Sequence, residues 1–367
     1  MRSTPYVSYV TTCWKRQPPR DSSRGAPVRW LPFLGLLFHL AGCTNDSRIP
    51  VTVYSPHGRD QLILLEKDFE SQNPDIDLRW LDMGSQEILD RIRFEKVNPQ
   101  ADVWFGGPTT IFDRGVAESL LAPYRPAWAA HVSPRGVGPG DLYWPVYETP
   151  AVIAFNNKAV SPGKAPRDWD DIMDPRWTNK VLIRDPVASG TMRAIWGLMI
   201  QRAMRWPGDT APGMAWLRRL DAQTKAYTLN PSILDQKLAR QEGLVTLWDL
   251  PDILISRNKG MPFGYVFPSS GTVVIDDAIG LVRGSRHPEA AKRFIDYVGG
   301  IHAQLLAARK VFRLPARLDL PADSVPDWVG EVKRSMVVAD VNWAELAAKG
   351  AEWMGYWDQR VRGSGHQ

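Results

Sequence analysis

Ser189-Gly190-Thr191 combines the residue types that bind a small anion at the start of a helix. The apolar pattern after it predicts a helix that runs to about Ala203. Free backbone N–H groups and the positive end of the helix dipole gather at such a first turn and attract negative charge. Arg184 and Arg193 flank the segment and could donate charge-assisted hydrogen bonds to a carboxylate or a phosphate. The alternative is structural, because serine is also a favoured helix N-cap without any ligand.

Other loops carry glycine, small hydroxyl residues, or an aromatic residue beside a carboxylate. Glycine lets a ligand approach the backbone, and serine and threonine supply adaptable hydrogen-bonding groups. The imidazole of His57 could bind a ligand or a metal, although a single loop histidine can also be structural. Trp248 could stack on a ligand and Asp249 could bind its amine or hydroxyl; alternatively, Trp248 lies in the core and Asp249 caps the next helix. The candidate contact residues outside the first segment are Ser55, His57, Ser85, Gln86, Gly107, Thr109, Trp248 and Asp249.

Strand, polar loop and helix alternate along the chain, which predicts an α/β fold with mostly parallel sheets flanked by helices. We expect strands at 51–54, 76–80, 102–105, 151–155, 180–183, 244–247, 272–275 and 278–282, and later helices at 190–203, 211–220, 233–240 and 288–298. Ligands of open α/β sheets bind beyond the carboxyl ends of the strands, so the candidate loops should converge there. The tail at 328–360 has a helical pattern and is expected to pack as a cap on one lobe.

The amino-terminal segment predicts export. Five basic residues precede an apolar run of about 12 residues at 30–41, which ends in Leu40-Ala41-Gly42-Cys43. This run is too short to span a bilayer, which needs roughly 20 residues. The cysteine after small residues resembles the lipobox of bacterial lipoproteins, and the resemblance implies cleavage before Cys43 and lipidation of its thiol. An ordinary secretory signal is the alternative, and the long polar stretch before Arg29 is consistent with a true start nearer Val28.

The charge balance argues against a nucleic-acid partner. The chain has 367 residues and a formal net charge of +5. Residues 1–42 hold six of the basic residues and one acid, so the part from Cys43 onward has 39 basic and 39 acidic residues. A neutral domain has no general field that attracts DNA or anionic lipid, so any anion selectivity must be local. With Cys13 in the signal and Cys43 lipidated, no disulfide is available.

Enzyme signatures are missing from the sequence. It has no GxSxG, HExxH or GxxxxGK[ST] motif, and its histidines are scattered without metal-site spacing. We therefore expect a binding protein with no catalytic residue, cofactor or metal site. A cell-envelope hydrolase is the remaining enzymatic alternative, but no residue stands out as its nucleophile.

Several segments together resemble the solute-binding proteins of bacterial ABC importers, in the group that binds ferric iron or organophosphates. They are Val53-Tyr54-Ser55, 101–105, 169–177, Ser189-Gly190-Thr191 and 288–294. The resemblance implies a two-lobed, periplasmic-binding-protein type II-like fold that closes on its solute by a hinge motion and then docks on a membrane permease with its ATPase. It further implies a monomeric periplasmic or cell-surface lipoprotein, anchored to a membrane through its lipid.

Mapped onto this chain, the resemblance implies the following division. Residues 1–42 form the signal peptide, 43–49 the lipidated tether, 50–148 plus 273–312 lobe one, 149–272 lobe two, and 313–367 a C-terminal helical segment.

The resemblance leaves the ligand open. Ferric-binding relatives carry two adjacent tyrosines that ligate iron, near the strand that ends here at Asp249, and this chain has no tyrosine there. An organic anion, phosphorylated or carboxylated, fits Ser189, Thr191 and the neighbouring arginines better. Ferric iron with a synergistic anion remains an alternative, as does a sensory lipoprotein that presents its ligand to a membrane kinase or receptor.

Overall fold

The computed structural model describes residues 47–364. The expected signal peptide and Cys43 lie outside the described residues. None of the described helices is both long enough and apolar enough to cross a lipid bilayer.

One sheet runs through the described part of the chain, with the strand order β2-β1-β3-β10-β5-β8-β6-β7. Its strands are β1 (Ile49–Ser55), β2 (Ile76–Asp82), β3 (Val103–Pro108), β4 (Leu121–Ala122), β5 (Trp144–Asn156), β6 (Val181–Arg184), β7 (Thr224–Thr228), β8 (Val245–Asp249), β9 (Phe263–Val266), β10 (Val274–Val282) and β11 (Leu314–Pro315). The α-helices are α1 (Gly58–Gln72), α2 (Ser85–Phe94), α3 (Thr109–Ala117), α4 (Gly190–Ala203), α5 (Ala211–Gln223), α6 (Pro231–Ala239), α7 (Leu250–Asn258), α8 (Pro288–Val298), α9 (Ile301–Val311), α10 (Asp327–Ser335) and α11 (Trp343–Arg360).

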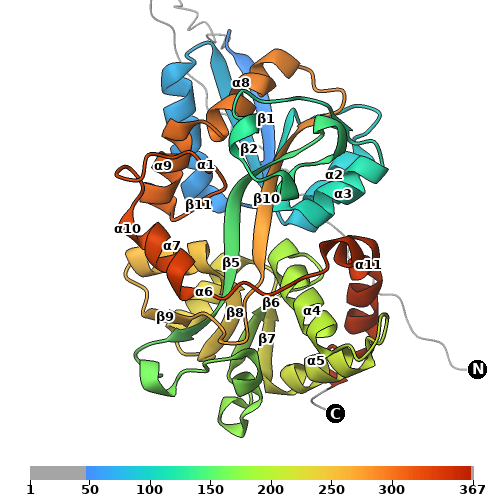
Figure 1. Cartoon of the computed structure of the whole chain (residues 1–367), viewed down its shortest axis with the longest axis vertical. Helices are drawn as coiled ribbons and strands as arrows, with labels where there is room; N and C mark the ends of the chain where they lie inside the picture. Colours follow the sequence, from blue (N-terminus) through green and yellow to red (C-terminus); the bar gives the residue numbers. More distant parts are fainter. Residues whose placement is uncertain (1–46, 365–367) are drawn as a thin grey trace, which may run out of the picture. The chain divides into compact units, whose positions relative to one another are not determined.

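Two long strands, β5 and β10, join two groups of parallel strands. The first half of β5, at 144–150, pairs antiparallel with β10, and its second half pairs with β8 and β9. On one side of this junction β1 lies parallel to β2 and β3; on the other, β6 lies parallel to β7 and β8. Figure 1 shows β5 and β10 side by side between the two groups. We call the part around β1, β2 and β3 lobe one and the part around β6, β7 and β8 lobe two.

The crossing strands differ most from the sequence-based expectation. The two short strands expected at 272–275 and 278–282 form the single strand β10, whose register shifts beside Asp277. A bulge adds one residue and so interrupts the alternation from which the strand was predicted. The strand expected at 151–155 begins earlier, at Trp144, and includes Pro145 and Pro150. Proline lowers the strand signal of a sequence, which explains the underestimate.

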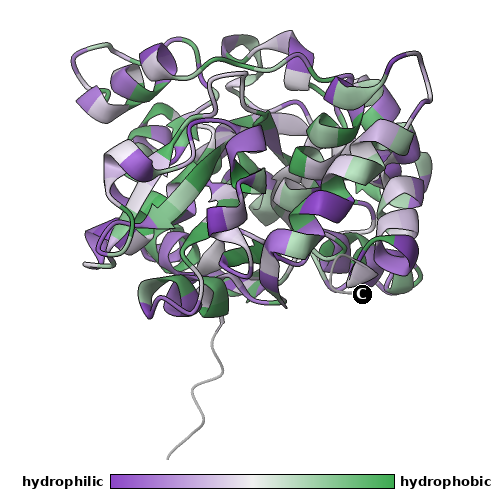
Figure 2. Ribbon diagram, turned by 90° about the horizontal axis from the view of Figure 1, so that it is seen from below, coloured by the Kyte–Doolittle hydropathy of each residue, from purple (hydrophilic) through white to green (hydrophobic). Residues whose placement is uncertain are grey.

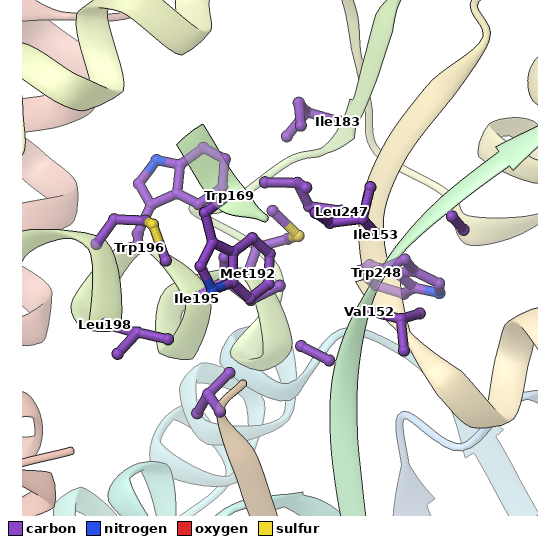
Figure 3. Close-up of a cluster of buried hydrophobic side chains, with 14 of the residues drawn as sticks. Val152, Ile153, Trp169, Ile183, Met192, Ile195, Trp196, Leu198, Leu247 and Trp248 are labelled. Atoms are coloured by element: carbon purple, nitrogen blue, oxygen red, sulfur yellow. The ribbon is translucent and has the colours of Figure 1, made fainter. Parts of the chain in front are cut away.

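The core of lobe two fixes the position of α4. Met192, Ile195 and Trp196 on this helix pack with side chains of β5 and β8 in one buried cluster (Figure 3). Trp196 also contacts Trp357 of α11, with ring centroids 6.0 Å apart. Figure 2 shows hydrophobic residues concentrated along the strands and hydrophilic residues on the outer helices. Because α4 is packed on several sides, its first turn has a defined place.

The tail is helical, as expected, and consists of α10 and α11. Both helices contribute to the core of lobe two, through Val329, Val332 and Trp357 among others. However, α11 also contacts α3, which belongs to lobe one. The expected cap on a single lobe therefore reaches the other lobe as well.

Candidate functional site

A cavity of about 720 Å³ lies where the carboxyl ends of the parallel strands of both lobes meet. Six helices begin at this cavity: α1, α2 and α3 from lobe one, and α4, α6 and α7 from lobe two. Thr149 of β5 and Asp277 of β10 line it from the crossing strands. This is the position at which open α/β sheets bind their ligands, and we call the cavity the cleft.

Most of the predicted contact residues come together in the cleft. Those that line it are His57, Ser85, Gly107, Arg184, Ser189, Gly190, Thr191, Trp248 and Asp249. Four others do not line it, namely Ser55, Gln86, Thr109 and Arg193.

Three of those four side chains have structural partners instead. The Ser55 hydroxyl accepts a hydrogen bond from the His57 backbone N–H. The Gln86 amide donates to Asp90 on the next turn of α2. The Arg193 guanidinium donates to the Val187 carbonyl at 2.6 Å. Arg193 therefore holds the loop before α4, whereas Arg184 lies in the wall of the cleft.

The first turn of α4 has backbone N–H groups that no described residue accepts from. The Ser189 hydroxyl accepts from the Met192 N–H at 3.2 Å, so this serine is the helix N-cap. The N–H groups of Gly190 and Thr191 belong to the first turn, where no intrahelical acceptor exists, and no described residue accepts from them. Both residues line the cleft, so the two donors are available to a bound group.

Arg184 adds a buried cation to this turn. Its side chain is 5% exposed, and it donates through Nη1 to the Thr228 carbonyl at 3.2 Å. Its Nε is buried and has no hydrogen-bond partner within the described part of the chain. Burial lowers the pKa of this guanidinium from its ordinary value. A buried guanidinium with an unused donor is costly unless an anion is bound beside it.

Glycine brings the start of α4 close to lobe one. A Cβ at Gly190 would lie 2.6 Å from Cδ of Pro108, the N-cap of α3, and 3.1 Å from Oγ of Ser85, the first residue of α2. Gly107 has φ +100° and leaves room for the same serine hydroxyl. The positive ends of α2, α3 and α4 therefore meet around Ser85, and each favours a negative charge nearby.

Several carboxylates in the cleft have structural roles. Asp249 caps α7 by accepting from the Asp252 N–H at 3.0 Å, and Glu87 accepts from the Gly84 N–H at 2.7 Å. Asp277 accepts from the N–H of Gly107. Burial, and then the charge of Asp252, raise the pKa of Asp249 well above its ordinary value. Asp249 is thus a cap, and Trp248 belongs to the core of lobe two, yet both also line the cleft.

His57 is a buried, neutral side chain in the wall of the cleft. Neither ring nitrogen has a hydrogen-bond partner among the described residues, and Nε2 lies 3.7 Å from Asp277 Oδ2. Burial, and then the charge of Arg313, lower the pKa of its imidazole. The ring packs against Gly106, where a Cβ would lie only 2.4 Å from His57 Cε1. The neutral imidazole can either donate or accept a hydrogen bond.

Some cleft residues were not predicted from the sequence. They include Thr149, Asp235, Asp252, Lys259, Asp277 and Arg313. Asp235 and Asp252 lie within helices, and Thr149 and Asp277 lie within the crossing strands. These positions do not lie in the loops that directly follow parallel strands, so the strand-loop-helix pattern of the sequence carries no signal for them.

The described residues that line the cleft do not form a metal site. Among residues 47–364, no group of three or more His, Cys, Asp or Glu side chains is arranged to hold a metal ion. No tyrosine is found among the described residues that line the cleft.

Comparison with known proteins agrees with this architecture. Residues 99–344 match a family model described as bacterial extracellular solute-binding protein. The probable ABC transporter periplasmic-binding protein y4fP of Sinorhizobium fredii is 24% identical over 305 residues, covering 83% of this chain and 84% of that protein. A putative 2-aminoethylphosphonate-binding periplasmic protein of Salmonella typhimurium is 26% identical over 299 residues, covering 78% of this chain and 85% of that protein.

A solved structure shares the fold. The periplasmic binding protein AfuA of Actinobacillus pleuropneumoniae, determined with exogenous fructose-6-phosphate bound, aligns with a TM-score of 0.75 and 23% identity. The alignment covers 86% of this chain and 100% of that chain. The α/β, two-lobed architecture predicted from the sequence is confirmed. The family model matches more than half of this chain. The chain therefore belongs to the bacterial extracellular solute-binding proteins, the substrate-binding components of ABC transporters.

Proposed function

We propose that this protein binds a small organic phosphate or phosphonate in the cleft and delivers it to the permease of an ABC importer. One observation carries this proposal: the buried Arg184 lies in the same cavity as the N–H groups that open α4, and among residues 47–364 neither its Nε nor these N–H groups have a hydrogen-bond partner. These groups together would bind the oxygens of a tetrahedral anion through charge-assisted hydrogen bonds. The names of two relatives, one for 2-aminoethylphosphonate and one solved with fructose-6-phosphate, support the same ligand class.

The proposed ligand contacts come from both lobes. Arg184, Ser189, Gly190 and Thr191 would hold the anion from lobe two, and Ser85 would reach it from lobe one. Gln86, Thr109 and the other predicted contacts outside the lining would support the neighbouring loops. An iron site is less well supported, because the described cleft offers no tyrosine and no described group of three or more His, Cys, Asp or Glu side chains is arranged to hold a metal ion.

We also propose that the lobes close by bending at β5 and β10, with lobe one at 50–148 plus 273–312 and lobe two at 149–272. Contacts across the cleft support a closed arrangement. Lys259 Nζ lies 2.5 Å from Asp60 at the rim, and Ile255 of lobe two packs against the core of lobe one. Opening the cleft would break both contacts, so a bound ligand that bridges the lobes would favour closure.

Membrane attachment is a separate proposal. The family implies an exported, periplasmic protein. We propose that cleavage before Cys43 and lipidation of its thiol anchor the protein, as a monomer, to a membrane. Mass spectrometry of the mature protein should find an acylated amino-terminal Cys43. A mature protein of Cys43→Ser that stays in the membrane fraction after a salt wash would contradict the lipid anchor.

Calorimetry with the purified mature protein tests the ligand class. The panel is 2-aminoethylphosphonate, ethylphosphonate, glucose-6-phosphate and fructose-6-phosphate, with citrate and Fe(III) for the alternatives. We expect at least one phosphorus-containing compound to bind with a Kd in the micromolar range or below, and citrate to bind much more weakly. Binding of Fe(III) without binding of any phosphorus compound would overturn the proposal.

Substitution of Gly190 by alanine should weaken ligand binding, because the added Cβ would hinder closure of the two lobes. The Cβ of Gly190→Ala would meet Pro108 of lobe one at 2.6 Å, so the closed arrangement would have to open slightly. Overpacking of this kind costs about 1–3 kcal/mol, so we expect the Kd to rise about 5-fold or more. Gly163→Ala is the matched control, because no atom lies within 4 Å of its added Cβ. Equal affinities of the two variants in calorimetry would contradict a close approach of the lobes at this point.

A further inference from the structure

We propose that the solute carries a protonated amine in addition to its anionic group, and that Asp235, Asp252 and His57 bind this amine in the same cleft. We call these three residues the amine subsite. The inference rests on the proposed function, because it assumes that the anionic group lies at the first turn of α4. It narrows the ligand to a small zwitterionic phosphonate or phosphate.

The charges of the cleft do not suit a purely anionic ligand. Seven carboxylates line it, against four arginines and lysines. Asp249, Glu87 and Asp277 accept backbone hydrogen bonds, as described above, and Asp60 pairs with Lys259. The lining carboxylates outside these pairings are Asp82, Asp235 and Asp252. Of these three, only Asp252 has a described arginine, Arg313, within 4 Å, so a ligand with only negative charge would be repelled by the other two.

Asp235 is the clearest unsatisfied acceptor in the cleft. It lies on α6, and its Oδ2 accepts from the Ser256 hydroxyl of α7 at 2.6 Å. Its Oδ1 is buried and has no hydrogen-bond donor anywhere in residues 47–364. A buried carboxylate oxygen without a donor destabilises the protein. An ammonium group would supply up to three donors and a compensating charge.

Asp252 extends the acceptor site toward lobe one. Its Oδ2 accepts from the Trp248 indole at 3.1 Å, and its Oδ1 lies 3.7 Å from Nη2 of Arg313. Its charge raises the pKa of Asp235 and opposes the lowering of the pKa of His57, so it lies near both groups.

His57 provides an independent sign that a polar group is bound here. Its side chain is 3% exposed, it lines the cleft, and both ring nitrogens lack partners among the described residues. A buried imidazole with two unused nitrogens is destabilising unless a ligand reaches it. Because the imidazole is neutral, it can accept an N–H from the amine, and it does so from the lobe opposite Asp235 and Asp252.

The topology limits the size of the ligand. α6 follows β7 and α7 follows β8, and both strands are direct neighbours of β6, which leads into α4. The three residues of the amine subsite and the first turn of α4 line the same cavity of about 720 Å³. A molecule with its amine and its phosphorus group separated by a few bonds would reach both.

Matched ligand pairs test this inference. Calorimetry compares 2-aminoethylphosphonate with ethylphosphonate and 3-aminopropylphosphonate with propylphosphonate, on the wild type, Asp235→Asn and Asp252→Asn. For at least one of the two pairs, we expect the wild type to bind the aminoalkylphosphonate at least 10-fold more tightly than the alkylphosphonate of the same chain length. Each variant should reduce that ratio below about 3-fold. Asp340→Asn, an exposed residue outside the cleft, should keep the wild-type ratio.

The outcomes separate the inference from the proposed function. Equal binding of both members of each pair would overturn the amine subsite and leave the anion site standing. Binding of none of the four phosphonates would overturn both.

Thermal unfolding of Asp235→Asn shows whether the variant loses its preference for amines because it is misfolded. The pKa of Asp235 is raised to about 7, chiefly by burial; the Ser256 hydrogen bond opposes the shift, the charge of Asp252 adds to it, and the charge of Lys259 opposes it. A carboxyl group with a raised folded-state pKa destabilises the protein as the pH rises from its ordinary value through that pKa. Asp235→Asn should therefore melt higher than the ligand-free wild type at pH 8, with a smaller difference at pH 5. A lower melting temperature at pH 8 would contradict the unsatisfied state of Asp235.

Discussion

Replacing Arg184 with glutamine should weaken phosphonate or phosphate binding by about 100-fold and leave the protein folded. Hydrogen bonds to charged groups contribute about 1.5–3 kcal/mol, which corresponds to about 10- to 150-fold in Kd. The fold should survive, because Nη1 of Arg184 bonds the Thr228 carbonyl and a glutamine amide can donate to the same carbonyl. The native cation is also buried with an unused Nε, so its removal relieves a cost.

Calorimetry gives the affinity, and thermal unfolding without ligand shows whether the variant is folded. Arg202→Gln is the matched control, since Arg202 lies on α4 but pairs with Asp170 outside the cleft. It should bind with the wild-type Kd. If Arg184→Gln kept wild-type affinity while remaining folded, the anion would not be at the first turn of α4.

The two arginines near this turn show what spacing along a sequence can and cannot predict. Arg184 ends β6, and Arg193 lies on the first turns of α4, so both flank the predicted anion segment. Which of them faces the ligand depends on the rotation of the helix about its axis. That rotation is set by core packing, which places Arg193 against the Val187 carbonyl. The sequence places both arginines beside the predicted anion segment but does not show which of them lines the cleft.

The loops were predictable because their position follows from topology. A strand, a polar loop with glycine and a helix recur in the sequence, and parallel strands bring such loops to one edge. The same reasoning does not predict the cleft residues of the crossing strands. Thr149 of β5 and Asp277 of β10 both line the cleft. The Thr149 hydroxyl donates a hydrogen bond to the Asp277 carboxylate, although the two residues are 128 positions apart in the sequence. No local pattern records a pairing over that distance.

The capping groups explain how the cleft separates charges. All six helices present their amino-terminal ends to it, so dipoles alone would favour anions everywhere. Carboxylates occupy the starts of α7 and α2, through Asp249 and Glu87. α4 is capped by the neutral Ser189, keeps two N–H groups without an acceptor among the described residues, and begins beside the buried cation of Arg184. An incoming anion should therefore prefer α4, and the acidic side near α7 remains for a cation.

Truncation of Trp357 to alanine should cause the largest loss of stability in the C-terminal segment. Trp357 is fully buried, and its ring lies 6.0 Å from Trp196 and 5.3 Å from Tyr227. Large aromatic-to-alanine changes in a core cost about 3–5 kcal/mol. The denaturant midpoint of Trp357→Ala should therefore fall clearly below that of the wild type. Trp206→Ala is the control, since Trp206 is 61% exposed and its loss should change stability by about 0.5 kcal/mol or less.

The same variant should weaken ligand binding, although Trp357 is not in the cleft. Arg362 lies 4.7 Å above its ring and donates to Asp185 Oδ2 at 2.6 Å. Asp185 in turn accepts from the Ser189 N–H through its carbonyl, and so sets the turn that presents the first N–H groups of α4. We expect Trp357→Ala to raise the Kd several-fold under conditions in which it is folded. An unchanged Kd together with a lowered midpoint would show that the tail stabilises lobe two without positioning the anion site.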